Sequence, residues 1–66
     1  MKTMTMTKEQ AMAIVSEYRL DADSSISEII DAICNYLMMA SYMFRKKDLC
    51  SLVRVITDYI VNHVED

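Results

Sequence analysis

The 66-residue sequence contains no glycine, no proline and no tryptophan. The lack of glycine excludes the glycine-rich loops that hold phosphates and dinucleotides, because those loops need backbone conformations that only glycine adopts easily. It also excludes glycine-based tight turns. Two cysteines and one histidine are too few for a disulfide framework or for a zinc site of the usual kind. We therefore expect no metal ion and no cofactor.

A surplus of positive charge is also missing. Seven basic residues stand against ten acidic residues, which gives a net charge of −3. A domain that holds nucleic acid through its phosphates normally shows a basic surplus. No run of five or more acidic residues is present either, so the chain does not have the pattern of an acidic tail.

Long hydrophobic runs are absent as well. The longest apolar stretch covers residues 29–44, and Asp31, Asn35 and Ser41 interrupt it. A membrane span is not predicted from such a stretch. The first residues alternate methionine and threonine and lack the apolar core of a secretion signal. We expect a cytoplasmic protein with reduced cysteines.

What the sequence does contain is apolar surface. Hydrophobic residues make up 53% of the chain. A domain of this size buries only about 60% of the surface of its unfolded chain and gains about 3–5 kcal/mol of net stability. A small body with so much apolar side chain commonly places the excess at an interface. We therefore expect one domain that associates with itself or with another protein.

Hydrophobic spacing predicts three helices. A capping box of Thr7 and Gln10 precedes a helix over residues 8–20, and a second capping box of Ser25 and Glu28 precedes a longer helix over residues 26–45. In each box the hydroxyl accepts from a backbone amide of the first turn, and the longer side chain accepts from the amide of the capping residue.

A third helix is predicted over residues 49–64, with Asp48 as its N-cap. The sequence thus indicates an all-α fold, a small three-helix bundle with the second helix at its centre. Its domain covers residues 7–66 behind a flexible N-terminal tail of residues 1–6. Short connections favour antiparallel neighbours. We expect the bundle to assemble as a helical homodimer, because an added interface would stabilise so small a core.

The apolar second half of the second predicted helix is the strongest candidate for an interface. From residue 36 to residue 44 only Ser41 is polar, and several apolar side chains project away from the main stripe. Methionine is flexible and polarisable, which suits a surface that adapts to a partner. The alternative is that the first helix covers this face. The predicted interface residues are Cys34, Met38, Met39 and Tyr42.

A second candidate is a basic edge beside the connection to the third helix. Its members are Arg45, Lys46, Lys47 and Arg54. They are candidates for contact with nucleic acid or with an acidic partner. The alternative is that residues 45–47 simply close the second helix, since cations stabilise helix C-termini. The third helix offers no array of side chains suited to reading base edges.

No catalytic constellation is present. The two cysteines belong to no C-x-x-C motif, and the chain is too short to enclose a substrate pocket of several hundred Å³. The Asp21-x-Asp23-x-Ser25 spacing resembles the start of a calcium loop, but Ile26 occupies the position where that loop needs glycine. We therefore expect neither an enzyme nor a small-molecule binder.

The leading hypothesis is a small cytoplasmic protein-interaction module that acts through its apolar Met/Tyr-rich helix face. It would be an adaptor, a chaperone-like subunit or an inhibitor, and its small size alone suggests a phage or mobile-element protein. The alternative is a small dimeric DNA-binding transcriptional regulator that uses the basic edge. No motif longer than a capping box points to a family.

Overall fold

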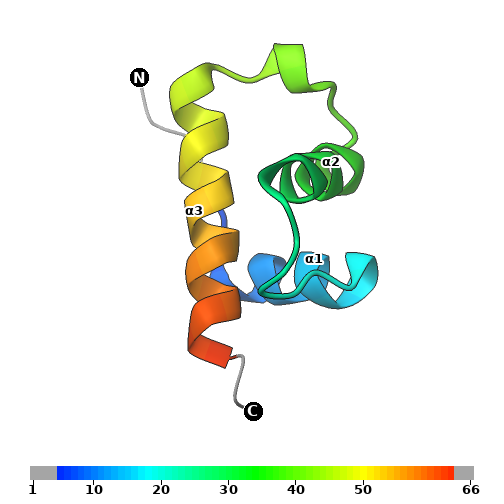
Figure 1. Cartoon of the computed structure of the whole chain (residues 1–66). Helices are drawn as coiled ribbons and strands as arrows, with labels where there is room; N and C mark the ends of the chain where they lie inside the picture. The colour runs from blue at the N-terminus through cyan, green and yellow to red at the C-terminus, as the bar shows by residue number, and fades with distance from the viewer. Residues whose placement is uncertain (1–4, 64–66) are drawn as a thin grey trace.

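The computed structural model describes residues 5–63, and this part of the chain is helical without any strand. Figure 1 shows the order of the elements: α1 (Lys8–Tyr18), α2 (Ile26–Leu37), the short 3-10 helix η1 (Ser41–Met43) and α3 (Lys46–His63). The radius of gyration is 11.2 Å, close to the value of about 11 Å expected for a compact domain of this length. The prediction of an all-α, three-helix fold is confirmed.

Both predicted capping boxes are present. Thr7 Oγ1 accepts from the amide of Gln10 at 3.1 Å, and the amide of Thr7 donates to Gln10 Oε1 at 2.9 Å. Ser25 and Glu28 make the same reciprocal pair, with both distances 3.1 Å. Each box satisfies two amides that the helix leaves without an intrahelical partner, so the local sequence fixes where α1 and α2 begin.

The C-termini of α1 and α2 are built without glycine. Arg19 and Met38 follow the two helices and adopt left-handed conformations, with φ of 52° and 57° respectively. In α2 the amide of Met38 donates to the carbonyl of Asn35, and the amide of Met39 donates to the carbonyl of Cys34. These two bonds make a Schellman motif, which usually has glycine at the left-handed position.

The prediction that the second helix continues to residue 44 or 45 is wrong, because α2 ends at Leu37. The chain then turns, and it places Met39 and Phe44 against the core from outside the helix. A continued helix would keep the periodicity but carry this segment away from α3. Burial of Met39 and Phe44 by tertiary packing therefore outweighs local helix propensity.

The predicted start of the third helix is also wrong. Asp48 is not the N-cap, because α3 begins at Lys46 and the amide of Leu49 donates to the carbonyl of Arg45 at 3.0 Å. Asp48 lies inside the first turn, where a negative charge is still favourable next to the helix N-terminus. Lysine is a good helix former, so Lys46 and Lys47 extend the helix toward Arg45.

The central element is α3 and not the second helix as predicted. The helix α3 runs across both α1 and α2 (Figure 1), and it packs against each of them more extensively than they pack against one another. With 18 residues, α3 is the longest helix in the described part of the chain. The predicted antiparallel placement of the second and third helices is also wrong, since α2 lies across α3 in Figure 1.

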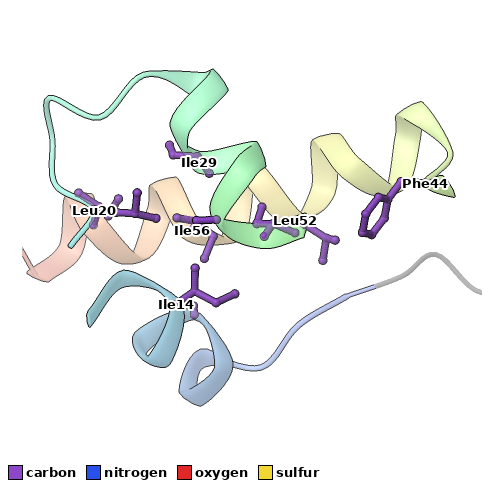
Figure 2. Packing of buried hydrophobic residues seen from close by; sticks show 10 residues of the cluster. Ile14, Leu20, Ile29, Phe44, Leu52 and Ile56 are labelled. Atoms are coloured by element: carbon purple, nitrogen blue, oxygen red, sulfur yellow. The ribbon is translucent and has the colours of Figure 1, made fainter. Parts of the chain in front are cut away.

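The core lies where the three helices meet. Figure 2 shows Ile14 of α1 and Ile29 of α2 directed toward the side of α3 that carries Leu52 and Ile56. Ile14 and Ile56 are fully buried. Among residues 5–62, the buried apolar residues are Ala11, Ile14, Leu20, Ile29, Ala32, Ile33, Phe44, Leu52, Ile56 and Ile60.

The ends of the chain fall partly outside residues 5–63. Of the predicted tail of residues 1–6, the described part is Thr5 and Met6, and Met6 packs half-buried against the core. Within residues 5–63, none of the helices is both long enough and apolar enough to span a membrane.

Candidate interaction surfaces

The first candidate surface is the segment between α2 and α3, residues 38–43, which we call the connecting segment. Met38 is 90% exposed, Tyr42 is 88% exposed and Met43 is 57% exposed. On either side of Tyr42 the chain is fixed, because Met39 and Phe44 pack against the core. The connecting segment therefore holds Tyr42 and Met43 in solvent between two anchored positions, and Met38 in solvent just before the first of them.

The four predicted interface residues do not share one helix face. Met38 and Tyr42 lie in the connecting segment, and both are exposed. Met39 and Cys34 are half-buried against the core. Helix α1 does not cover Met38 or Tyr42, so the alternative in which the first helix buries this whole group does not hold for those two residues.

Burial affects the chemistry of Cys34. Desolvation raises the pKa of its thiol above the ordinary value, and the nearby negative charge of Asp31 raises it further. The thiol of Cys34 is therefore harder to ionise, and less reactive, than an exposed cysteine thiol. Cys50 is also a free cysteine, and it is exposed on α3.

The second candidate surface is a groove of about 650 Å³ between the first half of α2 and α3, which we call the α2/α3 groove. Lys46, Arg54 and Asp58 stand among its lining residues. Its remaining wall is largely apolar and is made by Ile26, Ile30, Leu49, Cys50, Val53 and Thr57.

Sequence analysis missed this groove. A signal was present, since Lys46, Cys50, Val53 and Thr57 follow the i, i+4, i+7, i+11 spacing of one helix face. That face lies beside the core stripe of α3 and becomes a groove only when the first half of α2 packs alongside. The relative placement of α2 and α3 cannot be obtained from either helix alone.

Three of the four predicted basic residues belong to α3, and none of the four closes the second helix. Arg45 precedes α3, and its Nε donates to Asp48 Oδ2 at 3.0 Å. Lys46 and Lys47 are exposed in the first turn, where the helix dipole disfavours positive charge. Helix capping therefore does not explain these lysines. Lys46 and Arg54 both line the α2/α3 groove.

Residues 5–63 contain no group of three or more histidine, cysteine or acidic side chains that could hold a metal ion. In the predicted connection over residues 21–25, Asp21 Oδ1 accepts from the amide of Asp23 at 2.8 Å, and Ser24 Oγ accepts from the amide of Asp21 at 2.9 Å. These bonds form a local turn of the kind that aspartate and serine favour.

Comparison of this chain with protein-family models, with curated proteins and with solved structures gives no match. Its function is therefore argued from its own two surfaces.

Proposed function

We propose that this chain is a small protein-interaction module that works as a homodimer and presents its connecting segment to another protein. The observation that carries the proposal is the exposure of Met38 and Tyr42, at 90% and 88%. Large apolar side chains gathered in solvent commonly mark an interaction site. Tyrosine and methionine are both enriched at protein interfaces.

The anchoring of the connecting segment supports the same proposal. Met39 and Phe44 hold it to the core, so its binding conformation is largely formed before the partner arrives. A pre-ordered segment loses little conformational entropy on binding. The module is proposed to act in the cytoplasm as an adaptor, a chaperone-like subunit or an inhibitor, without catalysing a reaction.

The test is site-specific photocrosslinking in the native cytoplasm, with a photoreactive phenylalanine at position 42. We expect one protein to crosslink and to be lost when Met38→Glu is added. The matched control is Met12→Glu, because Met12 is an exposed methionine on α1, 49% exposed and outside the connecting segment. Equal crosslinking in the two variants would contradict the proposal.

One observation favours a second function, a dimeric DNA-binding regulator. Lys46 and Lys47 are exposed in the first turn of α3, and helix capping does not account for them. A chain with this function would bind a DNA duplex at low salt, and its affinity for that duplex would fall steeply as the salt concentration is raised. A Lys46→Glu/Lys47→Glu variant would abolish that binding. A mixed-sequence duplex that does not shift at low salt would count against this function.

A further inference from the structure

We propose that the α2/α3 groove binds α3 of a second copy of this chain, with the two α3 helices antiparallel about a two-fold axis. This inference rests on the proposed homodimer and names the surface that forms it. It leaves the connecting segment free for the other protein.

The groove has the apolar surface that helix packing needs. Ile26 is 58% exposed at its rim, Cys50 is exposed, and Ile30 and Val53 are half-buried. On α3 the spacing from Lys46 through Cys50 and Val53 is that of a seam between packed helices. The exposed apolar face of the groove and its helical spacing are therefore suited to contact with another helix.

The positions of the charged residues indicate that the helix bound in the groove is α3 of a second copy. Lys46 and Asp58 both line the groove and are twelve positions apart on α3, a separation of about 18 Å along the helix axis. In an antiparallel pair each Lys46 meets Asp58 of the other copy, and this happens twice. A parallel pair would set lysine against lysine and aspartate against aspartate. The groove is thus self-complementary in one orientation, as a two-fold interface requires.

The apolar and charged contacts agree on one register. When Cys50 of one copy lies opposite Val53 of the other, Lys46 lies level with Thr57 of the other copy and beside its Asp58. The groove contains one more cation, Arg54. It lies one helical turn from Asp58 on the same helix, so the negative charge of Asp58 offsets its positive charge.

The first test measures mass and orientation on the full chain. Sedimentation equilibrium from about 1 to 100 μM should show a dimer that dissociates on dilution. A zero-length carbodiimide should then join Lys46 to Asp58 in the dimer band, as read by mass spectrometry. This bond can form only between copies, because the two side chains lie about 18 Å apart along the helix of one chain.

The second test exchanges the charges. Lys46→Glu and Asp58→Lys should each weaken the dimer about tenfold or more, because each variant places like charges at both ends of the seam. An equal mixture of the two variants should recover association, and so should the double variant. The matched control is Lys47→Glu, since Lys47 is an exposed lysine of the same turn that does not line the groove.

Three outcomes would overturn the inference. The first is that the chain is still monomeric at about 100 μM in sedimentation equilibrium. Another is a dimer that Lys46→Glu and Cys50→Glu leave unchanged, with circular dichroism showing both variants folded. The third is a dimer lost in Tyr42→Glu but kept in Lys46→Glu, which would assign self-association to the connecting segment. If the photocrosslink at position 42 fails while the charge exchange succeeds, only the proposed partner surface is lost.

Discussion

Asp48 Oδ2 accepts a 3.0 Å hydrogen bond from Arg45 Nε, and the two side chains differ sharply in exposure, at 9% and 52% respectively. The aspartate is thus nearly buried within the first turn of α3, while its cationic partner lies half in solvent. The two ends of this ion pair should therefore contribute unequally to stability.

Replacing Asp48 should be the more costly change. We expect Asp48→Ala to lower the free energy of unfolding by about 1–3 kcal/mol, because it removes a buried charged acceptor from a helix N-terminus. Arg45→Ala should cost less than about 1 kcal/mol, as is typical of an exposed ion-pair partner. Urea denaturation of both variants checks the order, and equal losses would contradict it.

The left-handed residues offer a stabilising substitution. Met38→Gly and Arg19→Gly should each raise the free energy of unfolding by about 0.5–1 kcal/mol, because glycine adopts positive φ without a steric penalty. The matched control is Ala40→Gly, at a connecting residue with φ of −74°. There glycine only adds freedom to the unfolded chain, so that variant should be less stable than the parent. Thermal and urea unfolding of the three variants measure the difference.

The core where α1, α2 and α3 meet should tolerate little truncation. Ile56 is fully buried, and Ile56→Ala should cost about 2–5 kcal/mol through lost burial and the cavity left behind. Such a loss consumes most of the stability expected for a chain of this size. Met12→Ala, at an exposed position of α1, should stay within about 0.5 kcal/mol of the parent. Circular dichroism at increasing urea distinguishes the two.

The two cysteines should differ in reactivity. In protein dilute enough to be monomeric, alkylation near neutral pH should modify exposed Cys50 first, and Cys34 more slowly, because burial and then Asp31 raise the pKa of Cys34 above its ordinary value. Asp31→Asn should lower that pKa and speed alkylation of Cys34. Mass spectrometry of timed samples follows both sites. Equal rates for Cys34 in the parent and in Asp31→Asn would remove the assigned role of Asp31.

The raised pKa of Cys34 also predicts how the free energy of unfolding changes at high pH. The folded chain holds Cys34 protonated to a higher pH than the unfolded chain does, so the favourable contribution is complete below the pKa of the thiol in the unfolded chain and declines as pH rises through its raised pKa in the folded chain. Unfolding measured across this range should show a smaller decline in Cys34→Ala than in the parent.

Local signals in the sequence predicted the starts of α1 and α2. The Thr7/Gln10 and Ser25/Glu28 boxes involve residues three positions apart, so their hydrogen bonds depend on little else. The end of α2 was not predictable in this way. Residues 38–44 keep helical spacing and lack glycine or proline, and the break depends on burying Met39 and Phe44 against distant residues.

The two candidate surfaces also differ in how far the sequence could predict them. The exposed apolar excess around Met38 and Tyr42 could be expected from composition and spacing. The α2/α3 groove could not, because Ile26 and Cys50 come from separate elements that meet only after α3 crosses α2. The location of Lys46 and Lys47 also depended on where α3 begins, and the sequence placed that start at residue 49, three residues too late.

The glycine-free break after Leu37 has a consequence for the order of folding. Nothing in residues 38–44 opposes a helix locally, so an early α2 is free to run on past Leu37 while the rest of the chain is still unfolded. The turn at Met38 becomes favourable only when Phe44 joins the buried core cluster, to which all three helices contribute. Shortening of that helix and docking of α3 should therefore form a single late step, and substitutions at Phe44 should slow folding more than substitutions within α2.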